Sequence, residues 1–242
     1  MQVVLLAAGM AQRLRPLTDS CPKCLLDVAG KSILERALDA LMHFGLVDFV
    51  VVTGYRAGMI RERVEAKYQK LRVTWITNER YAETNNAYSL LQAERSVTEA
   101  FLLLDSDILF PPRLVQKLLE CRELPCIALD RHPCGEEEIK LLLDERDNVQ
   151  EIGKGIDPSK AAGESVGIEI FSDASRQQLF RTLRKRIASE RRENEFYEAS
   201  FKEMIDNGTK FRAVDTTGFS AMEIDSAEDL ERARARYQGG GR

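Results

Sequence analysis

The sequence predicts an α/β fold of the Rossmann-like, doubly wound class, with one mixed sheet that is mostly parallel. Short apolar runs rich in Val, Ile and Leu alternate with helical patterns through about residue 120, which is typical of parallel strands buried on both faces. Consecutive strand patterns follow, which indicate a smaller antiparallel extension. The chain has 242 residues, of which 44% are hydrophobic, so it is long enough for one large domain of this class.

In the first half of the chain, strands and helices are expected to alternate. The expected strands cover 2–8, 48–54, 72–78 and 100–110, and the expected helices cover 32–45, 57–70 and 86–96. Right-handed crossovers between such strands place helices on both faces of the sheet.

In the second half, strand patterns follow one another directly. Strands are expected over 124–132, 138–148, 149–155, 164–172 and 211–215, and helices over 174–193, 197–208 and 226–237. A turn at Asp147-Asn148 predicts antiparallel pairing among the first of these strands. We expect a single domain over 1–238, in which 121–238 forms one wall of a cleft opposite 1–120, and a flexible tail over 239–242.

Composition excludes several classes of protein. The chain has 35 basic and 39 acidic residues and a formal net charge of −4, so it lacks the overall basic field of a nucleic-acid-binding protein. The apolar run near the N-terminus is too short to span a bilayer and lacks the features of a signal peptide. We therefore expect a cytoplasmic protein with no nucleic-acid partner and no membrane insertion.

The Cys21-x-x-Cys24 pair is the most conspicuous short motif of the sequence. A zinc site would need a second such pair or two histidines, but His43 and His132 are isolated. A strand-like run rather than a helix follows Cys24, which argues against a thioredoxin-like redox site. The five cysteines are therefore interpreted as reduced structural thiols.

The loop after the first strand is the first candidate binding site, because ligands gather at the carboxyl ends of parallel strands. Gly9 allows the backbone N–H groups to turn toward phosphate oxygens. Arg13 can bind a phosphate through two hydrogen bonds, and Lys23 follows a proline that stiffens its approach. The spacing matches neither Walker A nor G-x-G-x-x-G, and a solvated basic loop is the alternative interpretation.

Carboxylates at the ends of two apolar stretches predict a site for a divalent cation. Asp105 and Asp107 share one face at the end of a deeply apolar strand, where paired carboxylates repel unless a cation binds them. Asp225 ends a second apolar stretch, and with Asp107 it would complete a site for Mg²⁺. The alternatives are a turn-capping aspartate and a helix cap, although Ser226 with Asp229 already explains the cap.

Two further segments carry polar groups that suit a nucleotide or a phosphate. Asn85 and Asn86 precede a helix, where an amide can read a nucleobase edge or simply act as an N-cap. Lys154 lies between two glycines after an expected strand. It can be interpreted as a phosphate ligand or as an exposed lysine of a turn.

These motifs together resemble those of the sugar-phosphate nucleotidyltransferases. "LLAAGMAQRLRPLT" with "PKCLLDVAGKSILER" is similar to the pattern L-A-A-G-x-G-x-R followed by P-K, with Ala11 where glycine is usual. "TNNAYSLL", "LLLDSDI", "ESVGIEIFS" and "EIDSAEDL" extend the resemblance along nearly the whole chain. The pattern is most similar to that of the bacterial phosphocholine cytidylyltransferases and their relatives acting on inositol phosphate or aminoethylphosphonate.

The resemblance implies a role for each candidate residue. It makes 1–120 the nucleotide-binding half and 121–238 the acceptor- and metal-binding half, with Lys23 and Arg13 catalytic and Asp107 and Asp225 holding Mg²⁺. The nucleotide would contact Leu6, Ala7, Ala8, Gly9, Met10, Ala11, Arg13, Lys23, Asn85, Asn86 and Asp105. The acceptor phosphate would contact Lys154, and Glu164 is a further candidate for the acceptor site. A choline head group would need an aromatic and acidic box, for which the sequence offers Tyr197, Glu198 and Phe219, although Glu198 could equally pair with a primary amine or a sugar hydroxyl.

The activity implied is Mg²⁺-dependent cytidylyl transfer from CTP to a phosphocholine-like phosphate or phosphonate, with release of pyrophosphate. A phosphate monoester is mostly a dianion at neutral pH, so it needs no general base. The alternatives are a uridylyl- or thymidylyltransferase for a sugar 1-phosphate and a catalytically silent nucleotide-binding paralogue. The sequence slightly favours a cationic acceptor and leaves open its identity and the oligomeric state, a homodimer included.

Overall fold

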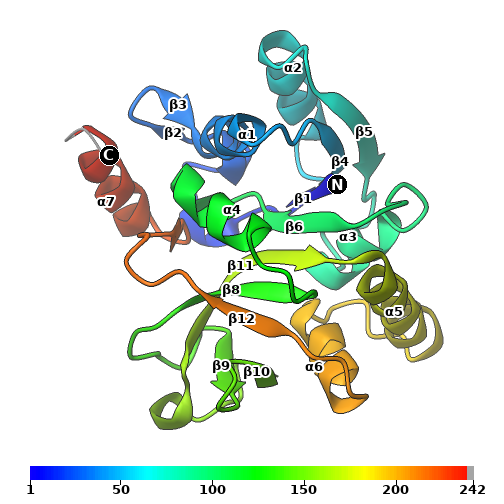
Figure 1. Ribbon diagram of the computed structural model, residues 1–242. Helices are drawn as coiled ribbons and strands as arrows, with labels where there is room; N and C mark the ends of the chain where they lie inside the picture. Colours follow the sequence, from blue (N-terminus) through cyan, green and yellow to red (C-terminus); the bar gives the residue numbers. More distant parts are fainter. Residues whose placement is uncertain (239–242) are drawn as a thin grey trace.

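Strand β1 (Gln2–Ala7) lies inside a nine-stranded mixed sheet that is covered by helices on both faces (Figure 1). The computed structural model describes residues 1–238, so the predicted tail over 239–242 lies outside the described residues. The predicted fold class, a mostly parallel Rossmann-like sheet with an antiparallel extension, is confirmed.

The parallel part of the sheet contains β6 (Phe101–Asp105), β1, β4 (Asp48–Thr53) and β5 (Arg72–Thr77), in that order. The chain passes from β1 to β4 and β5 on one side and then returns to place β6 on the other side of β1. The strand order therefore reverses between β1 and β6, and the carboxyl ends of strands at such a switch point form a crevice.

The antiparallel extension is organised around β11 (Gly163–Phe171), which pairs with β6 and β9 (Lys140–Leu143). β9 also pairs with β10 (Val149–Gly153), as the predicted turn requires. The expectation that β8 (Cys126–Asp130) pairs with β9 was wrong. β8 instead lies between β11 and β12 (Arg212–Asp215), because residues 131–139 form a long loop rather than a hairpin.

The helices agree with the sequence-based expectation except over Pro112–Leu119, where no helix was expected. They are α1 (Ile33–His43), α2 (Ala57–Lys67), α3 (Asn86–Gln92), α4 (Pro112–Leu119), α5 (Asp173–Arg184), α6 (Glu198–Asp206) and α7 (Ala227–Gln238). A π-helical turn, Lys185–Ser189, continues α5. Short 3₁₀ turns cover Gln12–Leu14, Lys23–Leu25 and Pro158–Lys160.

Four two-residue strands complete the fold: β2 (Asp27–Val28), β3 (Lys31–Ser32), β7 (Ile108–Leu109) and β13 (Met222–Glu223). The strand expected over 100–110 breaks at Ser106, so that β6 and β7 are separate and the chain turns at Asp107. β7 pairs with β13 rather than with the large sheet.

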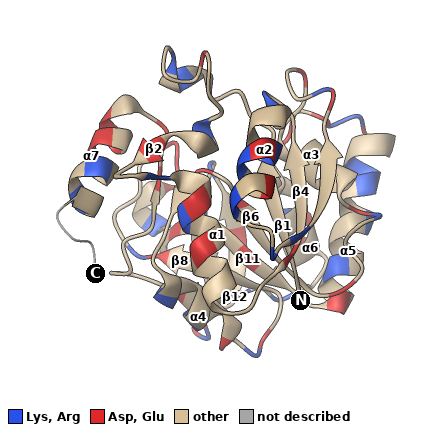
Figure 2. Cartoon of the chain, turned by 90° about the horizontal axis from the view of Figure 1, so that it is seen from above, with Lys and Arg blue, Asp and Glu red and all other residues tan. Residues whose placement is uncertain are grey.

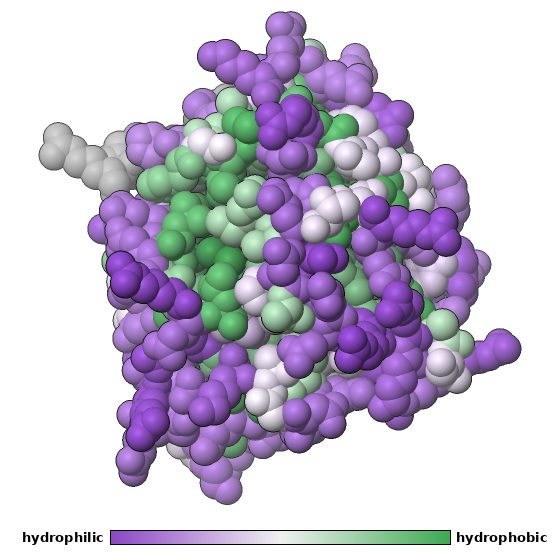
Figure 3. Space-filling view, turned by 45° about the vertical axis from the view of Figure 1, so that its right-hand side comes forward, coloured by the Kyte–Doolittle hydropathy of each residue, from purple (hydrophilic) through white to green (hydrophobic). Residues whose placement is uncertain are grey.

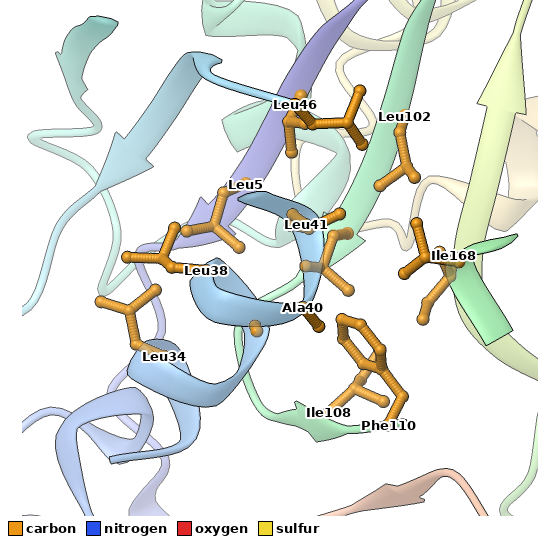
Figure 4. Close-up of a cluster of buried hydrophobic side chains, with 14 of the residues drawn as sticks. Leu5, Leu34, Leu38, Ala40, Leu41, Leu46, Leu102, Ile108, Phe110 and Ile168 are labelled. Carbon is orange, nitrogen blue, oxygen red and sulfur yellow. The ribbon is translucent and has the colours of Figure 1, made fainter. Parts of the chain in front are cut away.

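Side chains that alternate along β1 separate the core into two layers. Val3 and Leu5 pack with α1, α2 and α4, and Figure 4 shows Leu5 beside Leu34 and Leu38 of α1. Val4 faces the opposite cluster, which contains side chains of α3, α5 and α6. Because both faces of β1 are buried, its sequence is apolar without a break.

Charged residues lie mainly on the helices and loops, as Figure 2 shows for both signs. The face in Figure 3 is mostly hydrophilic, with hydrophobic side chains gathered in one area. Within residues 1–238 no helix has the length and hydropathy needed to cross a bilayer. All five cysteines are free thiols, which is consistent with their interpretation as structural residues.

Candidate nucleotide and metal site

A cavity of 410 Å³ opens at the carboxyl ends of β1 and β6, which is the switch point of the sheet. Its lining brings together most of the predicted site residues from distant parts of the chain. They are Leu6, Ala7, Ala8, Gly9, Ala11, Arg13, Lys23, Asn85, Asn86, Asp105, Asp107, Lys154, Glu164, Glu198 and Asp225. Met10, Tyr197 and Phe219 are not among the lining residues.

The loop after β1 contains a glycine, Gly9, with open space around its Cα and an alanine, Ala11, with a strained backbone. A methyl group added at Gly9 would meet no protein atom within 4 Å, so packing does not require glycine there. Ala11 has a φ of 46°, in the left-handed region, and its carbonyl accepts a hydrogen bond from Thr18 Oγ1 at 2.9 Å. This conformation explains why related sequences usually have glycine at the position of Ala11.

Lys23 lies among three carboxylates. Its Nζ is 2.6 Å from Asp225 Oδ1, 2.9 Å from Asp107 Oδ2 and 3.8 Å from Glu223 Oε1. Burial opposes its charged form, but Asp107, Glu223 and Asp225 outweigh this effect and raise the pKa of Lys23 above its ordinary value. Arg13 Nη2 contacts the other oxygen of Asp225 at 2.6 Å, so both predicted phosphate ligands converge on one carboxylate.

The carboxylates of Asp107, Glu223 and Asp225 fit a hard divalent cation. One oxygen of each lies within 4.8 Å of those of the others. Asp107 Oδ1 is buried and has no hydrogen-bond partner among the described residues. Desolvation in the cavity and the nearby Asp107 raise the pKa of Glu223 to about 8, as expected for carboxylates that lack a full complement of positive charge.

Glu223 is a site residue that the sequence analysis missed. It lies two residues before Asp225 in "MEID", so in an extended segment both side chains point to one face. The β7–β13 pairing places Glu223 opposite Ile108, and Ile224 N donates to Asp107 O at 3.1 Å. The small cluster of Leu14, Leu26, Ile224 and Leu230 fixes this segment against the first loop.

The two asparagines line the cavity but also have structural roles. Asn85 Oδ1 caps α3 by accepting from Asn86 N at 2.8 Å, as the alternative interpretation proposed. Asn86 Oδ1 accepts from Tyr197 N at 2.9 Å and so ties α3 to the segment before α6. Asn85 Nδ2 also donates to Asn194 O at 3.4 Å, so one N–H of the Asn85 amide and the amide of Asn86 are what these residues can offer as donors to a ligand.

The expected acceptor residues occupy three different environments. Lys154, Glu164 and Glu198 line the cavity, and His132 Nε2 lies 3.2 Å from Glu164 Oε2. Tyr197 is fully buried, and its hydroxyl donates to Asp105 Oδ2 at 2.8 Å, so it supports two cavity-lining residues, Asp105 and Asn86, without lining the cavity itself.

Phe219 lies away from the cavity and packs beside α4. The guanidinium carbon of Arg113 is 4.7 Å from the centre of its ring, and the ammonium of Lys117 is 5.3 Å from it. The Phe219 ring thus already has two of the protein's own cations beside it, and it does not line the cavity.

Comparison with known proteins supports the resemblance inferred from the motifs. The chain is 26% identical over 235 residues to the choline-phosphate cytidylyltransferase of Streptococcus pneumoniae, covering 96% of each chain. It is 28% identical over 190 residues to the 2-aminoethylphosphonate cytidylyltransferase of Lancefieldella rimae, covering 74% of this chain and 70% of that protein. It is 27% identical to the bifunctional IPC transferase and DIPP synthase of Aquifex aeolicus, covering 96% of this chain and half (50%) of that longer protein.

Solved structures agree in fold. The inositol-1-phosphate CTP transferase of T. maritima superposes with a TM-score of 0.81 at 22% identity, covering 99% of this chain and 96% of that one. The CTP:phosphocholine cytidylyltransferase LicC of Streptococcus pneumoniae gives a TM-score of 0.79 at 22% identity and covers 98% of both chains. The model of the MobA-like NTP transferase domain matches residues 3–193, so the chain belongs to the MobA-like NTP transferase family.

Proposed function

We propose that this protein transfers a cytidylyl group from CTP to a small phosphate or phosphonate acceptor and releases pyrophosphate. The observation that carries the proposal is the position of Lys23 and Arg13, beside the Asp107–Asp225 carboxylates, at the switch point of a nucleotidyltransferase fold. The similarity to cytidylyltransferases over most of the chain supports CTP as the donor.

The chemistry requires little more than positioning and charge. An acceptor oxygen forms a bond to the α-phosphorus of CTP, the bond to the bridging oxygen breaks, and pyrophosphate leaves with the electron pair. Because the acceptor is already a dianion, the main barrier is repulsion between two polyanions. Lys23 would neutralise the α-phosphate and the acceptor, and Arg13 would stabilise the departing pyrophosphate.

Asp107, Glu223 and Asp225 would hold Mg²⁺, which when bound supplies positive charge to the phosphates. The loop at Gly9 would bind the phosphates through backbone N–H groups, and the amides of Asn85 and Asn86 would face the base and ribose. In this scheme 1–120 supplies most of the nucleotide contacts and 121–238 supplies the acceptor wall.

A substrate panel tests the proposal. Pyrophosphate release is measured with CTP, UTP and dTTP, each with phosphoethanolamine, phosphocholine, 2-aminoethylphosphonate, inositol 1-phosphate and glucose 1-phosphate. We expect CTP to be the preferred donor. A preference for UTP with glucose 1-phosphate would favour the alternative suggested by the 35% identity to a Haloferax volcanii UTP–glucose-1-phosphate uridylyltransferase over 123 residues.

A further inference from the structure

The acceptor side of the cavity contains buried carboxyl oxygens without partners. Glu198, in the first turn of α6, is 7% exposed and lines the cavity, and its Oε2 has no hydrogen-bond partner among residues 1–238. Glu169 of β11 is fully buried behind the cavity lining, and neither of its carboxyl oxygens has a partner in the same described part of the chain. A buried carboxyl oxygen left unpaired is unfavourable, so Glu198 Oε2, which faces the cavity, favours a ligand that can donate a hydrogen bond to it.

The positive charge that acts on Glu198 is already paired with another carboxylate. Lys154 is the basic residue that acts on Glu198, but its Nζ is bound 3.2 Å from Glu137 Oε2 and lies 5.3 Å above the Phe196 ring. Burial raises the pKa of Glu198 to about 7, and Glu198 in turn helps to raise that of buried Glu169. In the acceptor wall, Lys154 is therefore already paired with Glu137, and Glu198 Oε2 is left without a hydrogen-bond donor among residues 1–238.

A quaternary ammonium group binds best against aromatic rings, and the exposed ring of this wall is that of Phe196, which is 45% exposed. The Lys154 ammonium lies 5.3 Å from the centre of that ring and competes with a ligand cation for it, whereas the Tyr197 ring is fully buried with its hydroxyl bound to Asp105. Tyr81 also lines the cavity, but its Cβ lies beside Gly54 and the Ala8 carbonyl, on the wall of the nucleotide loop.

We propose that the acceptor carries a primary ammonium group, which Glu198 binds directly with Glu169 behind it, and that the cavity selects against a trimethylammonium group. A primary ammonium donates three hydrogen bonds and can satisfy the unpaired Glu198 oxygen, whereas a trimethylammonium donates none. This inference rests on the proposed cytidylyl transfer and narrows its substrate class to aminoalkyl phosphates or phosphonates.

Three acceptors of similar length distinguish the effect of the acceptor's positive charge from the effect of its hydrogen-bond donors. Phosphoethanolamine carries a primary ammonium, phosphocholine a trimethylammonium, and 2-hydroxyethyl phosphate a neutral hydroxyl. With CTP and Mg²⁺, we expect kcat/KM for phosphoethanolamine to exceed that for each of the other two by at least about tenfold, the worth of one charge-assisted hydrogen bond.

The variant Glu198→Gln keeps the shape of the side chain and removes its charge. We expect it to raise KM for phosphoethanolamine at least about tenfold and to lower the preference for phosphoethanolamine over 2-hydroxyethyl phosphate by a similar factor. Asp206→Asn is the matched control, because Asp206 lies exposed in the same helix and loses the same charge. If Glu198→Gln does not fold, the wild-type acceptor series decides the question alone.

The outcomes distinguish the two proposals. Efficient use of phosphocholine, or an equal effect of Glu198→Gln on charged and neutral acceptors, would overturn the ammonium inference and leave cytidylyl transfer intact. Cytidylyl transfer from CTP only to inositol 1-phosphate or glucose 1-phosphate would also overturn the ammonium inference and leave cytidylyl transfer intact. No pyrophosphate release from CTP with any acceptor would overturn both.

Discussion

At the scale of single residues, the most consequential contact is the one between Lys23 and the predicted metal ligands. A lysine ammonium 2.6 Å from Asp225 and 2.9 Å from Asp107 neutralises carboxylates that a cation would otherwise occupy. The same ammonium is the group assigned to the phosphates in the proposed reaction. Lys23 would therefore exchange partners when nucleotide and metal enter together.

Removing the side chain of Lys23 or that of Asp107 should abolish most of the activity. We expect Lys23→Ala and Asp107→Ala each to lower kcat at least about a hundredfold, as removal of one preorganised stabilising group does in other enzymes. Steady-state pyrophosphate release measures the effect. Lys31→Ala is the control, because Lys31 is exposed and pairs within residues 1–238 only with Asp39, at 2.6 Å. A near-normal rate in either folded site variant would refute the assigned roles.

Lys23 should also compete with the metal. We expect Lys23→Met to bind Mn²⁺ more tightly than the wild type in the absence of nucleotide, because the ammonium no longer occupies the carboxylates. Electron paramagnetic resonance of free Mn²⁺ measures this affinity directly. Weaker Mn²⁺ binding by a folded Lys23→Met protein would contradict the competition.

At the scale of elements, the site is built where regular structure is interrupted. β6 ends at Asp105, and β11 has an irregular register between Ser165 and Glu169, with Gly167 inside the bulge. Such bulges re-aim side chains next to binding sites. Gly167 has a φ of 75°, and a Cβ there would lie 3.0 Å from Ile108 Cδ1.

Two glycine substitutions test this element. We expect Gly167→Ala to lower the free energy of unfolding by about 1–2 kcal/mol, because alanine is strained in the left-handed region. Gly58→Ala is the matched comparison, since Gly58 lies in α2 with open space around it and should stabilise by about 0.5–1 kcal/mol. Urea denaturation measures both, and equal effects of the two changes would contradict the role of the bulge.

The sequence predicted the positions of the helices and strands better than it predicted which strands pair. The apolar runs at β1, β4 and β6 identified the parallel core, because strands buried on both faces have a distinctive composition. The pairing of β8 was predicted incorrectly, because strand order depends on long-range packing and not on local pattern. Helix α4 was missed because two prolines precede its apolar stripe.

The same distinction applies to the site. Lys23, Asp107 and Asp225 were predictable because each directly follows a recognisable motif or apolar stretch. Glu223 was not, since its role depends on the β7–β13 pair, which no sequence pattern indicates. Phe219 was assigned to the acceptor by its type, but packing beside Arg113 places it elsewhere.

At the scale of the whole molecule, the buried carboxyls couple stability to pH. Glu198 has a pKa of about 7 in the folded protein, above the ordinary value of 4.5, and burial is the main cause. At pH values between 4.5 and about 7, Glu198 is protonated in the native protein but ionised in the unfolded chain, so the native protein binds more protons. The free energy of unfolding therefore falls as the pH rises through this window, and the fall ends once the pH exceeds the folded-state pKa of about 7.

Glu198→Gln should therefore reduce this pH dependence. A shift from 4.5 to about 7 corresponds to a loss of roughly 3 kcal/mol across that window, which the neutral glutamine does not suffer. We expect the variant to gain stability relative to the wild type as the pH is raised from 5 to 8. Urea midpoints measured at both values test this, and parallel curves for the two proteins would contradict it.

The central claim is that this fold places Lys23 and Arg13 to join a phosphate or phosphonate acceptor to the cytidylyl group of CTP. The most direct test is mass spectrometry of the products formed from CTP, Mg²⁺ and phosphoethanolamine. The account predicts equal amounts of pyrophosphate and CDP-ethanolamine, with formation of both lost in Lys23→Ala. Binding of CTP with no CDP-linked product from any acceptor in the panel would contradict it.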